Sequence, residues 1–394
     1  MEATERTPNF KQWSSTGLLL ALVGGAVTGG LATSLGSKTV LTSYLYAYTF
    51  WLALSLGCLG LLTLHHAIRG SWSLSTIRIF ESGGGPRMMM ALIVGFIPIF
   101  LGRHTIYHHW MHHEGVDKVL DAKAWWLNEP FWMVRIAIYF GLWILLGHVL
   151  VSSSRKEDQT LDRKLGQQRS SRGAFGLVVF MLSCTFAMTD WLMSIDPHWS
   201  STIFGLWTVI SGALTALAIS TIIVTTGAIN KVAPYSGIWT PKLGKDLGNM
   251  LFAFSMLWAY TSLSQFLIIW SGNLPEFITY YYYRQKDFWN ALGGLNIFVG
   301  FFMCWGVLLA PRVKASPRSL RNVACVILLV RATDWLWIVV PFLRGTLAVT
   351  EITAMVAMGG LWFFVMGREM TQAAILPEHD TRLVEMAKME AAHA

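Results

Sequence analysis

The sequence predicts an all-α polytopic membrane protein, with ten transmembrane helices, most of them in two parallel four-helix bundles. Of the 394 residues, 54% are hydrophobic and only 13% are charged, against about 25% charged residues in a soluble protein. Ten apolar runs each approach the ~20 residues that a helix needs to cross the bilayer core. The spans must be helical, because an open sheet edge would leave backbone groups unpaired in lipid.

The ten predicted spans run through most of the chain. They cover residues 16–35, 41–68, 87–105, 130–151, 174–193, 202–229, 247–270, 288–311, 322–341 and 347–366. The first run is longer than a cleaved leader and is expected to stay in the protein. It contains GGAVTGG, in which the spacing of Gly25 and Gly29 favours close packing against a partner subunit or the rest of the bundle. Residues 1–15 and 367–394 form the polar ends of a transmembrane domain at 16–366.

The distribution of Lys and Arg predicts the orientation of the chain. Of the 30 basic residues, 21 fall in the two termini and the loops on the same side, and 7 fall in the alternate loops. The segment SSSRKEDQTLDRKLGQQRSSRG is the most basic connection. Because basic loops stay inside, both termini are expected in the cytoplasm. The net charge of +8 therefore relates to the membrane and not to nucleic acid. The outer loops, rich in His, Trp and Tyr, suggest a docking face for a partner.

A short internal repeat supports two bundles that run in the same direction. The word Thr-Asp-Trp-Leu occurs at 189–192 and again at 333–336, and Phe-Trp opens two spans at 131–132 and 288–289. The members of each pair are four spans apart, so they point the same way. We therefore expect a first bundle at 41–193 and a second at 202–341, with the first and last helices peripheral to both.

Charged residues inside the spans are the candidate functional groups, because each costs ~2.5–3.5 kcal/mol at the bilayer centre. Arg331 and Asp334 lie at i and i+3, on one helical face. They form either an ion pair that lowers its own burial cost or part of a proton relay or headgroup site. Asp190 and Arg135 lie at similar depths on neighbouring spans, so they are expected to pair.

Histidines and cysteines add weaker signals. His65, His66 and His148 close two spans on the cytoplasmic side, where they either pack at the interface or pass protons inward. In RHTIYHHWMHH, His108 with His112 and His109 with His113 have helical ligand spacing, but no nearby acid or Cys completes a metal site. The four cysteines show no CxxC spacing, so no disulfide frame, iron–sulfur cluster or covalent haem is expected in this chain.

Several segments carry a resemblance to a known family. They are KAWWLNEPFWMVRIAIYFGLWILL, TDWLMSIDPHWSSTIFG, LGNMLFAFSMLWAYTSLSQFLIIWSGNLPE and VRATDWLWIVVPF. Together with the ten-helix plan they resemble the NrfD/polysulfide reductase membrane-subunit family. More narrowly, they are similar to the ActF-like quinol-type subunits of bacterial alternative complex III.

The resemblance implies a multi-pass protein of the bacterial inner membrane, in an assembly that oxidises quinol and reduces a periplasmic cytochrome c or similar acceptor. Its implied partners are a sister NrfD-type quinol subunit, an iron–sulfur subunit and c-type cytochrome subunits, which carry the redox centres. The family's quinol site uses a His and an Asp, which match His104 and Asp190 here.

Three hypotheses follow. In the first, Asp190, His104 and Arg135 mark a quinol site, and Arg331, Asp334, His148, His65 and His66 belong to a proton path. In the second, the chain is a non-catalytic anchor for the redox subunits. In the third, it is a secondary transporter that acts alone.

Overall fold

The computed structural model describes residues 7–112 and 116–377, together with residues 380, 382, 385 and 388. In this part of the chain, ten helices are long and apolar enough to cross a membrane, which confirms the predicted all-α architecture. They are α1 (Phe10–Gly30) with α2 (Ala32–Leu35), α3 (Ser37–Ile68), α4 (Ile77–Gly84) with α5 (Pro86–Leu101), α9 (Glu129–Thr160), α10 (Arg163–Trp191), α11 (Phe204–Ile229), α13 (Pro241–Gly272), α15 (Asp287–Ile297) continued by a π-helix (Phe298–Met303) and α16 (Cys304–Leu309), α18 (Pro317–Leu343) and α19 (Thr350–Met370).

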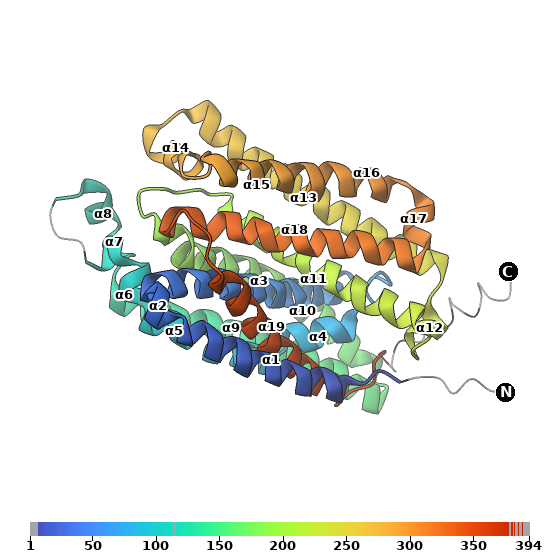
Figure 1. The fold of residues 1–394 in the computed structure, drawn as a ribbon. Helices are drawn as coiled ribbons and strands as arrows, with labels where there is room; N and C mark the ends of the chain where they lie inside the picture. The colour runs from blue at the N-terminus through green and yellow to red at the C-terminus, as the bar shows by residue number, and fades with distance from the viewer. Residues whose placement is uncertain are drawn as a thin grey trace.

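The helices lie roughly along one long axis (Figure 1). The start of α1 and the end of α19 lie at the same end of the molecule, which we call the termini end; the opposite end is the far end (Figure 1). Short helices cap the connections between the spans. They are α6 (Arg103–Ile106), α7 (His108–Met111), α8 (Lys118–Lys123), a 3₁₀ turn (Met193–Ile195), α12 (Tyr235–Ile238), α14 (Pro275–Tyr282) and α17 (Pro311–Ala315).

The central pair of helices is α3 and α11. In the most apolar stretch of each, 89% and 83% of the residues are buried. Both are apolar all round, which is typical of a helix surrounded by others. They meet at Gly57 and Gly212, where an added methyl group on Gly57 would collide with the Gly212 carbonyl. Around them, α3 contacts α4, α5 and α10, and α11 contacts α13 and α18. Helix α11 also contacts α10, and α3 also contacts α18 and α19, so the two central helices link the helices on both sides.

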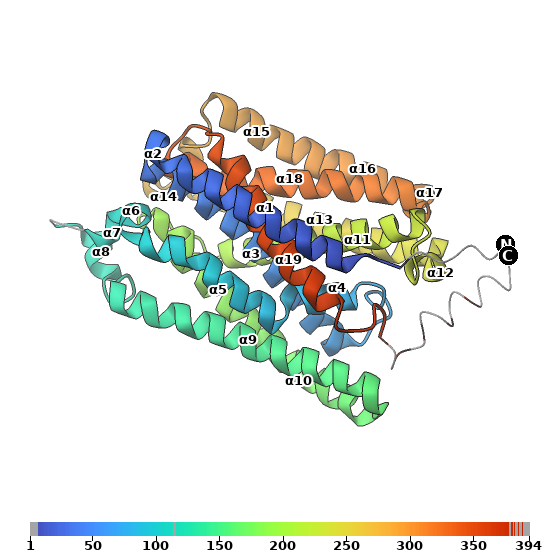
Figure 2. The ribbon, with the colours of Figure 1, turned by 60° about the horizontal axis from the view of Figure 1, so that its bottom comes forward.

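Helix α1 lies on the outside and packs along α19 (Figure 2). Gly17 and Gly24 face α19, where a methyl group would meet the backbone at Gly360 and Ala357. Gly25 and Gly29, the pair that the sequence singled out, face the other way, and nothing lies within 4 Å of an added Cβ. The glycines of α1 thus make one close helix contact and present a second small-residue face that no described residue covers.

Several spans extend beyond their predicted bounds; the first and seventh begin six residues earlier, and the ninth begins five residues earlier. The third span begins ten residues earlier than predicted, because Ile77–Gly84 forms the separate helix α4, and all eight of its residues are buried. The helix breaks at Gly85 and restarts at Pro86, which suits a first helical position. The basic segment expected as a loop between the fourth and fifth spans is helical instead: α9 continues to Thr160 and α10 begins at Arg163.

Candidate functional site

Asp190 lies at the far end of α10 and is completely buried. The guanidinium of Arg135, on α9, grips its carboxylate with two hydrogen bonds. Arg135 Nε donates to Oδ2 at 2.6 Å, and Nη2 donates to Oδ1 at 3.0 Å. This two-pronged geometry is the strong form of an arginine–carboxylate pair. The predicted pairing of these two side chains across neighbouring helices is present in the structure.

Two further donors complete the surroundings of Asp190. The Tyr139 hydroxyl donates to Oδ2 at 2.7 Å, and Trp126 Nε1 donates to Oδ1 at 2.8 Å. An ionised carboxylate has about four lone-pair positions, and four donors occupy them here. A new ligand at this carboxylate would therefore have to displace a donor that is already in place.

The local sequence explains how Arg135 is positioned. The Asn128 side chain accepts the Phe131 N–H at 3.0 Å and caps the start of α9, and Pro130 occupies the first turn. Arg135 then falls in the second turn of α9, next to Trp126. The Trp126 carbonyl accepts a hydrogen bond from Arg135 Nη1 at 2.9 Å. The guanidinium also stacks 4.2 Å from the Trp126 ring. Trp126, in the connection before α9, thus provides both a ring that stacks on the guanidinium and a carbonyl that accepts a hydrogen bond from it.

His104, the other predicted member of a quinol site, lies on α6 at the far end. Its side chain is 43% exposed, and Nε2 lies 3.7 Å from Glu129 Oε1. The ring packs against His112, with the two centroids 5.0 Å apart. From the same segment, Tyr107 reaches inward instead and donates to the Trp191 carbonyl, next to Asp190, at 3.0 Å. The structure brings Asp190 and Arg135 together and places His104 in a separate contact with Glu129.

The second buried pair lies in α18. Arg331 Nη1 donates to Asp334 Oδ2 at 2.8 Å, as the i, i+3 spacing predicts. Trp258, on α13, donates to the same oxygen at 3.2 Å. The Arg331 guanidinium carbon lies over the Trp258 ring, 3.7 Å from its centroid. Both donors reach Oδ2 and neither reaches Oδ1, so this carboxylate is less fully bound than that of Asp190.

A π-helix faces the Arg331 guanidinium. A methyl group added to Gly300, in the π segment Phe298–Met303, would lie 3.3 Å from Arg331 Nη2. This Nη2 has no hydrogen-bond partner among the described residues, and the same holds for the nearby Asn296 Nδ2. Asn296 is tied to α18 through its Oδ1, which accepts from Thr333 at 2.7 Å. Two buried donors without acceptors therefore lie beside a π-helix, a feature that is frequent at functional sites.

The two buried pairs correspond through the repeat. In each, the Asp of a Thr-Asp-Trp-Leu motif accepts hydrogen bonds from one arginine and from the indole of one tryptophan. The tryptophan belongs to a neighbouring element in both cases. They differ in depth. Asp190 is one residue from the end of its helix and Asp334 is nine residues from the end of its own. At ~1.5 Å per residue, the Asp334 pair lies roughly 12 Å further from the far end along its helix.

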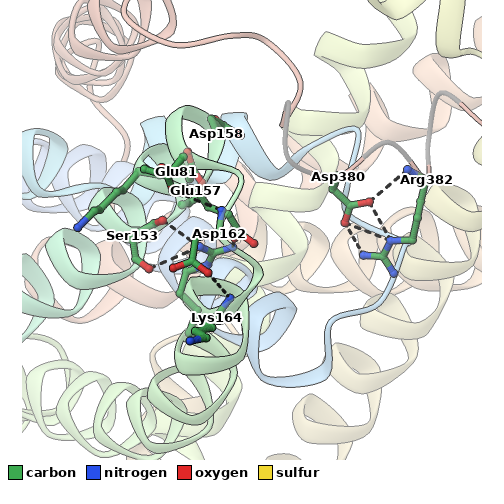
Figure 3. A network of polar contacts seen from close by, with 12 residues as sticks. Glu81, Ser153, Glu157, Asp158, Asp162, Lys164, Asp380 and Arg382 are labelled. Atoms are coloured by element: carbon green, nitrogen blue, oxygen red, sulfur yellow. Dashed lines mark hydrogen bonds and ion pairs between the residues drawn. The ribbon is translucent and has the colours of Figure 1, made fainter.

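A third charged cluster lies at the termini end, and the sequence reasoning missed it. Arg78 and Glu81 on α4 are buried, and Nη1 donates to Oε2 at 2.6 Å. Arg78 also pairs with Asp158 on α9, and Arg169 on α10 pairs with Glu157. Figure 3 shows Glu81, Glu157 and Asp158 gathered on one side, away from the pair of Asp380 and Arg382. The i, i+3 spacing of Arg78 and Glu81 was the available signal.

The histidines proposed for a proton path lie in different places. His65 and His66 are buried at the termini end of α3, where His65 Nδ1 lies 2.5 Å from Ser73 Oγ. His148 lies on an exposed face of α9. Asp334, in contrast, is in the far-end half of α18. Depth therefore separates these histidines from the Arg331 pair.

The residues around these sites leave little room for a ring-sized ligand. One small cavity, of about 20 Å³, lies between the connection after α10, α14 and α18, and another, of about 10 Å³, lies between α3, α10 and α11; neither is lined by Asp190 or Arg135. Aromatic rings pack beside Asp190, including Trp191 against Phe96 with centroids 5.0 Å apart. Four hydrogen-bond donors and packed aromatic rings therefore surround the Asp190 carboxylate. In the described part of the chain, no three His, Cys, Asp or Glu side chains gather as metal ligands; His113 lies outside it.

The comparisons with known proteins identify no family for this chain. No protein-family model matches the chain, and no curated protein matches it either.

Proposed function

We propose that this chain is an integral membrane subunit of a quinol oxidoreductase of alternative complex III type, and that it carries protons and not electrons. The second bundle holds the proton-carrying group, Asp334, beside the fixed charge of Arg331. Quinol is oxidised on a sister subunit, and the iron–sulfur and haem centres lie in further partners. The protein works in the bacterial inner membrane, with the termini end in the cytoplasm.

The observation that carries this proposal is the contrast between the two repeated carboxylates. Both are buried, but Asp190 accepts four hydrogen bonds and Asp334 accepts two, both at Oδ2. A proton added to Asp190 displaces a donor, whereas a proton on Asp334 Oδ1 leaves both of its bonds in place. A buried, incompletely bound carboxylate in a membrane span is a proton-relay candidate by default.

The neighbours of Asp334 suit this role. Arg331 stays protonated in proteins, so it is a fixed positive charge that favours the ionised form of Asp334 between transfers. Trp258 holds one carboxylate oxygen in place from α13. The unused donors Arg331 Nη2 and Asn296 Nδ2 provide positions at which a water oxygen could be held. The family resemblance of LWAYTSLSQFLIIWSGNLPE supplies the quinol-linked context.

The test is Asp334→Asn in the complete complex, reconstituted in vesicles with a pH dye inside or outside. Asn keeps the shape and the acceptor oxygen but binds no exchangeable acid proton. We expect the rate of proton release during quinol oxidation to fall. The fall should be roughly 10²-fold if proton transfer through Asp334 becomes the limiting step. Unchanged proton release and unchanged quinol turnover would remove Asp334 from the function.

A second candidate is a membrane anchor without a transport role, and the full satisfaction of Asp190 favours it for the first bundle. In that case Asp334→Asn has no effect on proton release, but the complex still loses its redox subunits when the chain is deleted. The remaining alternative, a transporter that acts alone, is tested by purification: co-purification with cytochrome and iron–sulfur subunits would contradict it.

A further inference from the structure

Helix α14 lies at the far end of the molecule (Figure 1), and a small cavity lies between it, α18 and the connection after α10. The cavity has a volume of about 20 Å³, and its lining includes the polar side chains of Asp196, Trp199, Tyr280 and Arg284. Apolar side chains such as Phe342 close the remaining sides. One water molecule needs ~10–15 Å³ of such space and two to four polar partners. The cavity therefore has room for one water molecule beside several polar groups.

Two hydrogen-bond donors at this cavity lack an acceptor. Trp199 Nε1 and the Tyr280 hydroxyl are buried, and neither has a hydrogen-bond partner in the described part of the chain. The two rings are stacked, with their centroids 4.2 Å apart and their planes 17° from parallel. A buried donor that is left without an acceptor loses its hydration and gains nothing in return. Because both residues line the same cavity, the acceptor that both lack is expected in that space.

Two side chains of opposite charge also line the cavity. The Arg284 guanidinium is buried and donates to the backbone carbonyls of Trp337, at 2.9 Å, and Ile338, at 2.6 Å, as well as to that of Tyr280. Asp196, in the connection after α10, offers carboxylate oxygens as acceptors. The guanidinium alone would attract a small anion, but the carboxylate at the same cavity offsets its charge. The lining therefore favours water, which can both donate and accept, over a halide.

We propose that this cavity is a water site, in which one ordered water molecule accepts hydrogen bonds from Trp199 Nε1 and the Tyr280 hydroxyl and donates one to the Asp196 carboxylate. The water joins the connection after α10 to α14, and Arg284 in turn ties the end of α14 to α18. It thereby fixes the far end of the first bundle against that of the second. This inference goes beyond the proposed function and does not depend on it.

The first test is Tyr280→Phe in the full chain, purified in detergent. The change keeps the stacked ring and removes only the hydroxyl. With the water in place, the variant loses a bridging hydrogen bond, and the midpoint of thermal unfolding should fall by about 1–3 °C. In a dry cavity the same change removes a buried donor that has no acceptor, so the midpoint would rise or stay the same. Either of those results would overturn the proposal.

The matched control is Tyr282→Phe, on the same helix. The Tyr282 side chain is 58% exposed, so its hydroxyl is hydrated in the folded and unfolded chain alike. The midpoint of this variant should stay at that of the unaltered protein. A fall equal to that of Tyr280→Phe would show that the loss at Tyr280 is not specific to the cavity, and would count against the water.

A double-variant cycle tests the bridge itself. Asp196→Leu keeps the approximate size of the side chain but removes the acceptor. In this background the water has already lost one partner, so adding Tyr280→Phe should lower the midpoint by less than it does in the unaltered protein. The Tyr280 hydroxyl has no direct partner among the described residues, so such coupling indicates a shared water. Additive shifts would contradict the bridge.

A density map of the unaltered protein, at a resolution that shows ordered water, gives the direct readout. We expect one density peak within hydrogen-bond distance of Trp199 Nε1, the Tyr280 hydroxyl and the Asp196 carboxylate, and no such peak in Tyr280→Phe. A map of the unaltered protein without the peak would overturn the proposal. Replacing chloride by gluconate at constant ionic strength should leave the midpoint unchanged; a fall would identify the occupant as a halide instead.

Discussion

The two halves of this protein place the same four-residue word in different surroundings. In the first, Asp190 lies near the helix end and is held by Arg135, Tyr139 and Trp126. In the second, Asp334 lies deeper and is held only through one oxygen. Removing one partner of a buried pair is costly, because an uncompensated charge then remains in the interior. A fully bound pair is therefore suited to holding helices together, and an incompletely bound pair to exchanging a proton.

The largest effect is expected from Asp190→Ala, which leaves Arg135 buried without its carboxylate. The loss should be about 3–5 kcal/mol of unfolding free energy, measured by thermal or denaturant unfolding in detergent. Glu129→Gln serves as the control, because its pair with Arg103 is partly exposed and should contribute under about 1 kcal/mol. Equal losses in the two variants would show that Asp190 holds nothing together.

The next effect separates stability from function in the second bundle. Replacing Arg331 with Met and Asp334 with Leu removes both charges at once, and such swaps are often neutral or stabilising. Thermal stability should hold while outward proton release falls by roughly 10²-fold. The matched double change, Arg135 to Met with Asp190 to Leu, should destabilise the protein more, because two donors, Tyr139 and Trp126, lose their acceptor there, whereas only Trp258 loses its acceptor in the second bundle. The comparison breaks down if the two double variants behave alike.

A smaller effect is expected at the π-helix. In Gly300→Ala, the new methyl group would lie 2.5 Å from Val330 Cγ1 and 3.3 Å from Arg331 Nη2. Such overpacking typically costs ~1–3 kcal/mol, and the shift of Arg331 should also slow proton release. Gly294→Ala has nothing within 4 Å of its Cβ and should leave release unaffected. A stability loss without any change in release would indicate that the π segment matters only for packing.

The smallest effect concerns pH. Because burial raises the pKa of Asp196, the folded state holds its proton at pH values where the unfolded chain has lost it. This carboxyl therefore destabilises the protein as pH rises from its unfolded pKa through its folded pKa. Since the group is partly exposed, Asp196→Asn should be more stable than the unaltered protein at pH 7 by less than about 1 kcal/mol. The difference should vanish below the unfolded pKa of an aspartate, at about pH 3; a difference that grows as pH falls would contradict the raised pKa.

The sequence predicted those features that are determined within a single helix. Spans follow from apolar runs, and the Arg331–Asp334 pair follows from spacing along α18. Depth was enough to pair Asp190 with Arg135, because these groups of opposite sign lay at similar levels of neighbouring spans. Contacts that depend on how a helix is rotated were not predictable, among them the indole donors Trp126 and Trp258.

Two other features escaped prediction for physical reasons. Arg78 and Glu81 have the same i, i+3 spacing as the pair in α18, but a polar, glycine-rich stretch hid the buried helix α4. His104 was matched to a site by family resemblance alone, and the short helices α6 and α7 turn it toward Glu129. Backbone direction in a connection of this kind depends on tertiary contacts that the local sequence does not encode.

The contact between Gly57 and Gly212 has a consequence for the size of what can cross this protein. The two central helices touch there at backbone distance, leaving no side chains between them that could rearrange. Carriers that expose a site alternately to each side commonly rock one half against the other, and here that motion would have to pull two main chains apart. A cargo that hops between fixed oxygen atoms needs no such opening.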